Sequence, residues 1–370
     1  MNAIATMKKR NYILTALAVC MLVACIVPAG AIVIPPESAG ALGAELIALT
    51  GPASSSGEST AASGYRGSVL ELYRKGTLHG EFFSTAASGY TGMILSGQEK
   101  VYALPDPVPE KGVIVLSRLY LYTTWSHDTS VREGISASPA VFWNGKELKA
   151  DAVYEDRKGS GIYDYPVETF AYDVSSIITA GEEAEVRVVN SGSDGHEFAA
   201  YGLLLLAVVE DPVAPQITYW ICEGSDIIFA DSGFGTTAAD ARTSVAFTGD
   251  AEIADLSGAS LLLVSTAASG LENDPHQVLF NGAAWDNPLS AGSSAISIAD
   301  LDVLSMVSAS GNTLEIASVP VSGGGDYMEN RNAVLVLIQD GAGEVPSAAG
   351  SSGNFFEWFI GRISALFGFS

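Results

Sequence analysis

Short runs of apolar residues, separated by turn residues, dominate the chain from about Gly67 to Asp340. Typical runs are SVLELY, VIVLSRLYLYTTW, ETFAYDV, AEVRVVN and YGLLLLAVV. Such runs, with turn signals between them, are typical of β-strands. Several are apolar at nearly every position, which indicates central strands covered on both faces. The pattern predicts an all-β fold of antiparallel β-sandwiches, of the jelly-roll or immunoglobulin-like kind.

The second half of this pattern repeats the first. VFWNG at 141–145 matches VLFNG at 278–282, YDV at 172–174 matches LDV at 301–303, and LLLAVVED at 204–211 matches AVLVLIQD at 333–340. The order of the matches is kept, which predicts a duplicated domain. We therefore expect two tandem sandwiches, at 67–212 and 213–340. In this alignment TTWSHD (123–128) takes the place of STAASG (265–270).

Asn-Gly pairs follow two of the matching runs, at Asn144–Gly145 and Asn281–Gly282. Both residue types tolerate positive φ, which a type I′ hairpin turn requires at both central positions. The sequence therefore predicts one such hairpin in each domain.

The N-terminus has the pattern of an export signal over residues 1–31. A basic MKKR precedes an apolar stretch, and PAGA ends in a small-residue cleavage pattern at Ala31. We expect a signal helix that is cleaved after Ala31. Two alternatives stay open, because LVAC resembles a lipidation site at Cys25 and because the apolar run continues to Ile34, long enough for a retained anchor. Residues 32–66 have the composition of a flexible lead-in.

A different pattern follows the linker at 341–353. Residues 354–370 predict a short amphipathic helix, which is too short for a comfortable membrane span and suits a membrane interface or a partner surface. Packing against its own domain is the alternative. Its apolar and aromatic residues are Phe355, Trp358, Phe359, Ile363, Leu366 and Phe367.

The composition narrows the choice of partners. The formal net charge is −24, so the surface repels nucleic acid. Of the three cysteines, two lie in the export signal, and Cys222 alone cannot form an internal disulfide. We expect Cys222 to be a small buried apolar side chain.

Catalytic motifs are not evident in the sequence, and two weaker clusters stand out. Trp125, His127 and Asp128, at a strand end, could line a sugar site by stacking of the indole ring, against the favoured reading in which Trp125 caps the core and His127 meets solvent. An acidic loop offers oxygen ligands of the kind that calcium prefers, against the simpler reading of a solvated loop. Its carboxylates are Glu155, Asp156, Asp164 and Glu168.

The runs RKGTLHGEFF, LSRLYLYTTWS, VFWNG, YDYPVETFAYDV and YGLLLLAVVEDP, followed by YWICEG, give the chain a family resemblance. It resembles domain of unknown function 3344, found in secreted and surface proteins of methanogenic archaea. The resemblance implies an exported archaeal all-β protein, and it implies no catalytic residues.

These observations favour a non-enzymatic extracellular or cell-surface protein that acts in envelope structure or adhesion, with envelope components or glycans as partners. Membrane contact is expected only through the two chain ends. The first alternative is a carbohydrate-binding module, assisted by Ca²⁺. A hydrolase with a dispersed site is a remote alternative, since fold alone does not settle function.

Overall fold

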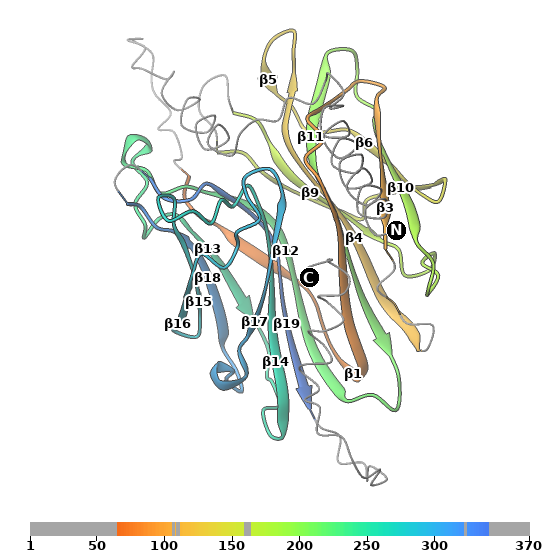
Figure 1. Cartoon of the computed structure of the whole chain (residues 1–370), viewed down its shortest axis with the longest axis vertical. Coiled ribbons are helices and arrows are strands. Elements are labelled where there is room, and N and C mark those ends of the chain that lie inside the picture. The colour runs from red at the N-terminus through yellow and green to blue at the C-terminus, as the bar shows by residue number, and fades with distance from the viewer. Residues whose placement is uncertain (1–64, 106–107, 109–111, 159–163, 322–323, 340–370) are drawn as a thin grey trace, which may run out of the picture. The chain divides into compact units, whose positions relative to one another are not determined.

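The computed structural model describes residues 65–105, 108, 112–158, 164–321 and 324–339 (Figure 1). Its strands, in chain order, are β1 (Val69–Ser88), β2 (Met93–Leu95), β3 (Glu99–Leu104), β4 (Val113–Asp128), β5 (Glu133–Gly134), β6 (Pro139–Trp143), β7 (Lys146–Leu148), β8 (Ala152–Asp156), β9 (Val167–Asp173), β10 (Ala184–Asn190), β11 (His196–Glu210), β12 (Gln216–Ile228), β13 (Arg242–Phe247), β14 (Leu256–Thr266), β15 (His276–Phe280), β16 (Ala283–Asp286), β17 (Ile296–Asp302), β18 (Asn312–Ser318) and β19 (Met328–Gln339). Within the described ranges, helical structure is confined to two 3₁₀ turns, η2 (Ser232–Phe234) and η3 (Leu304–Met306). The all-β prediction is confirmed.

The first half of the described chain builds two sheets. One has the order β1-β11-β4-β9-β8, and the other has the order β3-β10-β6-β7. One buried apolar cluster takes side chains from both sheets, including Leu119, Leu121, Leu203 and Leu205 from the first and Val141, Trp143, Val186 and Val188 from the second. Period-two alternation explains this arrangement, because one face of each strand of the second sheet carries the apolar residues.

The second half repeats this strand order. β12-β19-β14-β17 corresponds to β1-β11-β4-β9, and β13-β18-β15-β16 corresponds to β3-β10-β6-β7. A second buried cluster lies between these sheets and includes Trp220, Cys222, Leu261, Val278 and Phe280. Cys222 is buried and unpaired, as expected.

β1 is shared between the two halves, which the sequence did not predict. Its first part, Glu71–His79, pairs with β12, and its second part, Gly80–Ser88, pairs with β11. Val69 and Leu70 make a short parallel pairing with β13, the one parallel contact among the described strand pairs. Residues assigned by sequence to the first domain therefore hydrogen-bond to strands of the second half.

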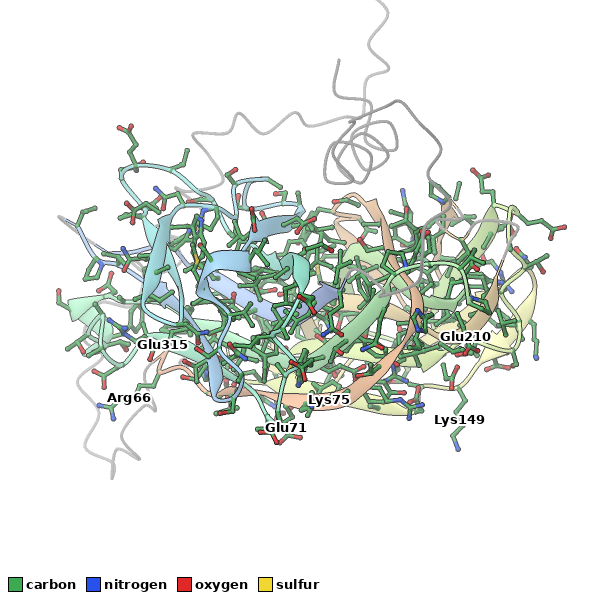
Figure 2. All side chains as sticks on the ribbon, turned by 90° about the horizontal axis from the view of Figure 1, so that it is seen from below. Arg66, Glu71, Lys75, Lys149, Glu210 and Glu315 are labelled. Carbon is green, nitrogen blue, oxygen red and sulfur yellow. The ribbon has the colours of Figure 1, made fainter. Side chains whose placement is uncertain are left out.

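A third apolar cluster joins the two halves face to face. Leu116, Tyr120 and Leu204 come from the β11-β4 side, and Tyr219, Val264 and Val334 come from the β12-β19-β14 side. This explains why β4 and β11 are apolar on both faces, since one face packs within the first half and the other packs against the second half. Charged side chains such as Glu71, Lys149 and Glu210 lie on the outside (Figure 2).

Three basic side chains cross this central interface. Arg118 of β4 donates to both carboxylate oxygens of Glu223 on β12, each at 3.0 Å. Arg331 of β19 donates to the backbone carbonyls of Glu168 (3.0 Å) and Thr123 (3.2 Å). Lys158, after β8, pairs with Asp226 and donates to the carbonyl of Ile227 at 2.9 Å. Burying a charge is costly unless it is paired, so these contacts hold the halves in one relative position.

Both predicted Asn-Gly hairpins are confirmed. β6 and β7 are joined by two residues, Asn144 (φ 47°) and Gly145 (φ 80°). β15 and β16 are joined by Asn281 (φ 46°) and Gly282 (φ 89°). The two asparagines also make the same contact, since Oδ1 of Asn144 accepts from the Glu185 amide (2.8 Å) and Oδ1 of Asn281 accepts from the Thr313 amide (2.9 Å).

Replacing Asn144 with alanine should lower the free energy of unfolding by about 1–2 kcal/mol, because alanine is disfavoured at positive φ and loses this hydrogen bond. Asn144→Gly is the matched control. It also loses the hydrogen bond but adopts positive φ freely, so its cost should be smaller. Urea unfolding of both variants measures the difference, and equal costs would contradict the backbone explanation.

Several predicted segments lie outside the described residues. These are the signal at 1–31, nearly all of the lead-in at 32–66, the linker at 341–353 and the aromatic tail at 354–370. Among the described residues, no helix has the length and apolar character needed to cross a membrane.

Candidate functional site

The end of β4 departs from regular strand geometry at Trp125. Glu197 of β11 pairs with His127, whereas Ala199 pairs with Thr124, so Trp125 and Ser126 together face one residue. This is a β-bulge. Trp125 has φ 55°, in the left-handed region that bulges of this kind usually fill with glycine.

The corresponding position in the second half is Ala267. Leu119 pairs with Tyr172 in the first half, and Leu261 pairs with Leu301 in the second, so Leu119 and Leu261 are equivalent. Trp125 and Ala267 each follow these leucines by six residues and are therefore equivalent as well. Ala267 has φ 62°. Both halves therefore have a left-handed residue at this position, but only the first half places a large indole ring there. A bulky residue at positive φ costs about 1–3 kcal/mol, and such strain concentrates at functional sites.

Two further rings complete what we call the Trp125 cluster, namely Trp125, His127 and Tyr165. Tyr165 stacks on His127 with ring centroids 4.6 Å apart, and it lies 5.6 Å from Trp125 in a tilted arrangement. The absence of a side chain at Gly134 of β5 allows the Tyr165 segment to approach, because a Cβ there would lie 2.1 Å from the carbonyl oxygen of Asp164. The backbone before Tyr165 therefore passes directly over β5, and all three rings keep partial exposure.

Polar contacts fix the cluster. Nδ1 of His127 contacts the Trp125 carbonyl at 2.8 Å, and its Nε2 contacts Oε1 of Glu197 at 3.1 Å. Asp128 is used differently, since its Oδ1 accepts from the amide (2.8 Å) and hydroxyl (2.6 Å) of Ser130. These hydrogen bonds lower the pKa of Asp128 and place its carboxylate in a turn. The structure thus joins Trp125 and His127 closely, with Asp128 at the margin.

Of the four predicted calcium ligands, Glu155 and Glu168 are cross-strand neighbours, but the four do not form one group. Glu155 accepts from the Ser136 hydroxyl (2.6 Å), Asp156 contacts Lys158 (2.8 Å), and Asp164 contacts Arg157 (3.1 Å). In the part of the chain that the structure describes, no three His, Cys, Asp or Glu side chains are grouped as a metal site would require.

Glu168, the fourth of these residues, is fully buried beneath the Trp125 end of the sheet. The Ala137 amide donates to Oε2 at 2.8 Å, and the Thr123 hydroxyl donates to the same oxygen at 3.2 Å. Burial raises the pKa of Glu168 to about 7, with the charge of Glu155 acting in the same direction and the hydrogen bond from the Ala137 amide acting against it. A pKa near neutrality suits a general acid. Here the carboxyl group is enclosed, so it does not present itself to a substrate.

A second aromatic group lies where the two halves meet, and we call it the Tyr65 cluster: Tyr65, Phe229, Phe234 and Tyr327. The Tyr65 ring centroid lies 5.8, 5.1 and 6.0 Å from those of Phe229, Phe234 and Tyr327. All three contacts are edge-to-face, the geometry that ring quadrupoles favour. Phe229 is buried and the other three rings are half-buried.

Sequence reasoning missed Tyr165, Glu197 and the Tyr65 cluster. Tyr165 lies in the acidic loop, where the sequence pattern points to the carboxylates and not to the aromatic ring. The sequence holds one clue to the site: TTW aligns with STA, so a tryptophan, Trp125, stands where the second half has an alanine, Ala267. The Tyr65 cluster has no such signal, because its rings come from three segments that are far apart along the chain: Tyr65, Phe229 with Phe234, and Tyr327.

Residues 64–338 match the model of a family described as "Protein of unknown function (DUF3344)". No curated protein matches the sequence.

Solved structures with distant similarity include PNGF-II, with 10% identity, a TM-score of 0.24, and coverage of 71% of this chain and 66% of that chain. A cycloalternan-forming enzyme from Listeria monocytogenes has 11% identity and a TM-score of 0.21, with coverage of 66% and 20%. The ANX2 ectodomain from Arabidopsis thaliana has 9% identity and a TM-score of 0.23, with coverage of 74% and 90%. The chain thus spans less than two thirds of the first two proteins, and at these TM-scores the similarity carries no argument about function.

Proposed function

The chain belongs to the DUF3344 family of proteins of unknown function, and we propose that it is an exported, non-catalytic surface protein that binds carbohydrate through the Trp125 cluster. Its body is a tandem pair of β-sandwiches that arose by duplication, in agreement with the repeated strand order. Export rests on the N-terminal signal pattern.

The observation that carries the proposal is the tryptophan at the bulge. The repeat shows that alanine satisfies this backbone position, yet the first half places a partly exposed indole there at a conformational cost. Beside it stand Tyr165, His127 and Glu197. A sugar ring has an apolar face that packs on an aromatic ring, and hydroxyl groups that bond to carboxylate and imidazole.

Trp125→Ala should therefore weaken glycan binding by at least about tenfold, about 1.4 kcal/mol, while the protein stays folded. Alanine already occupies the equivalent position, Ala267, at φ 62°, so little structural cost is expected. The measurement is a glycan array of the full-length chain, followed by titration calorimetry against the glycan that binds.

Trp285→Ala is the matched control, because Trp285 is a half-buried tryptophan of the second half that packs against another cluster. Its glycan affinity should be unchanged. A wild-type protein that binds no glycan, with or without a chelator, would refute the carbohydrate proposal. Binding that disappears with chelator would restore a role for calcium.

A structural role in the envelope is the second candidate, and the central interface favours it. An apolar cluster and the paired Arg118, Arg331 and Lys158 unite the two halves, which suits a rigid spacer. Fractionation of cells tests this role, since a structural component should be found in the envelope fraction in large amount.

A further inference from the structure

One chain of hydrogen bonds connects the Trp125 cluster to the Tyr65 cluster, and a charge acts between them. Asp164 directly precedes Tyr165, and the pKa of Tyr65 is raised by burial and, to a smaller extent, by the charge of Asp164. On the other side, the Tyr327 hydroxyl contacts Oε1 of Glu329 at 3.5 Å, and the hydroxyl of Thr124 donates to the same oxygen at 3.1 Å. Thr124 is the residue before Trp125. The two clusters are therefore linked through the enclosed side chains of Thr124 and Glu329, although one cluster lies in the first half and the other at the junction.

Both clusters keep rings at the surface. Six of the seven side chains are half-buried, namely Tyr65, Trp125, His127, Tyr165, Phe234 and Tyr327. Residues that only filled a core would be enclosed, as Trp220 and Phe247 are. Partly exposed rings in two linked clusters offer room for more than one apolar face of a ligand.

The polar groups around the rings are mainly acidic. Glu197 stands beside His127, Asp128 ends β4, and Asp231 begins the turn that carries Phe234. Arg157 is paired with Asp164 at 3.1 Å. With a net charge of −24 for the chain, this surface repels polyanions. Carboxylates accept hydrogen bonds from the hydroxyl groups of uncharged sugars.

We propose that the Trp125 and Tyr65 clusters form one continuous surface for an extended, uncharged polysaccharide, so that several sugar rings of one chain bind across the junction of the two halves. This inference rests on the proposed carbohydrate function and extends it. Trp125 and Tyr165 hold one part of the chain, and Tyr65, Phe234 and Tyr327 hold the next part. The junction supplies half of the surface, so an isolated first half would bind more weakly than the whole.

The test is the length dependence of binding by the full chain. The probes are oligomers of neutral β-glucan and mannan, from disaccharide to octasaccharide, with oligogalacturonides as the acidic series. Wild-type affinity should rise by at least about tenfold between the shortest and the longest neutral oligomer that bind. Oligogalacturonides should bind more weakly than neutral oligomers of equal length.

Phe234→Ala separates the two parts of the surface. It should abolish the gain from length and leave the affinity for short oligomers unchanged, whereas Trp125→Ala should weaken binding at every length. Phe142→Ala is the matched control, since Phe142 is a half-buried phenylalanine on an outer sheet, stacked with Arg187 at 4.1 Å. Thermal unfolding of each variant shows whether it is folded.

The outcomes distinguish the two proposals. Affinity that is independent of length, or a Phe234→Ala variant that keeps the full gain from length, would overturn the extended surface and leave the Trp125 site standing. Tighter binding of oligogalacturonides would overturn the uncharged class. If neither neutral series binds while the array identifies another glycan, the extended surface for these polymers is wrong. If the array is also negative, the carbohydrate function fails as well.

Discussion

Replacing Glu223 with alanine should lower the free energy of unfolding by about 3–5 kcal/mol, the cost of leaving one partner of a buried ion pair alone. Glu223 is fully buried and accepts four hydrogen bonds: two from Arg118, one from the Tyr120 hydroxyl (2.8 Å) and one from the Tyr154 hydroxyl (2.8 Å). Arg118 is also fully buried and stacks on the ring of Tyr73 at 4.0 Å. Without Glu223, its guanidinium would keep only Asp151 as a charged partner. Urea unfolding of the variant and of the wild type measures the difference.

Two controls make this result specific. Glu99→Ala removes the partner of Arg187 from an exposed ion pair of similar length, 3.0 Å, and should cost no more than about 1 kcal/mol because water screens that pair. Replacing Arg118 and Glu223 together, as Arg118→Met with Glu223→Leu, should recover part of the loss, since no buried charge is then left alone. A Glu223→Ala cost as small as that of Glu99→Ala would show that the interface does not depend on the pair.

Replacing Glu168 with glutamine should remove a pH-dependent loss of stability of about 3 kcal/mol between pH ~4.5 and pH ~7. Burial raises the pKa of Glu168 from 4.5 to about 7 in the folded protein. Below pH 4.5 the carboxyl is protonated in both folded and unfolded chains, and its full contribution to stability is present. As the pH rises toward 7, the unfolded chain releases the proton first, so the free energy of unfolding falls. Above pH 7 both forms are ionised and the loss is complete.

Glutamine keeps the shape of the side chain and does not titrate. Its oxygen can accept from the Ala137 amide, and its amide group can donate to the Thr123 hydroxyl. The difference in unfolding free energy between variant and wild type should therefore grow from pH 4.5 to pH 7 in favour of the variant. Glu155, the cross-strand neighbour of Glu168, is the control position. It is exposed, and Glu155→Gln should change the slope much less. Parallel profiles for Glu168→Gln and wild type would contradict the assignment.

A buried polar network connects the stability of the fold to the Trp125 cluster. Arg331 donates to the backbone oxygen of Glu168 and to the hydroxyl of Thr266, and Thr123 and Thr124 contact Glu168 and Glu329 on opposite faces of β4. The bulge at Trp125 follows directly. The buried polar network therefore forms the base on which the Trp125 cluster rests, and this explains how the fold can hold a tryptophan at positive φ.

Much of the fold could be predicted because the signals are local. Alternating and continuous apolar runs predicted antiparallel strands, and the Asn-Gly pairs predicted both hairpins, since the conformational freedom of these residues belongs to the residues themselves. The duplicated motifs predicted a repeat, and the same strand order recurs in the two halves.

The site was predicted in part. The sequence predicts Trp125 and His127 as site residues, and they lie together. Their ring partner Tyr165 follows a loop whose path depends on how closely the backbone of Asp164 approaches Gly134. The acidic residues of that loop were grouped by their spacing in the chain. Strand pairing places Glu155 beside Glu168, but their side chains bind Ser136 and Ala137, while Asp156 and Asp164 pair with Lys158 and Arg157.

By itself, the sequence determined the strand content and the two hairpin turns, because each depends on interactions within a few residues. Matching motifs in the two halves also indicated the repeat. The tertiary structure decided that β1 serves both halves, that Arg118, Arg331 and Lys158 cross the interface between them, and that Tyr65 meets Phe229, Phe234 and Tyr327. These contacts join residues that are up to about 260 positions apart, as Tyr65 and Tyr327 are. Their energy comes from burial and pairing, which exist only when the sheets are packed.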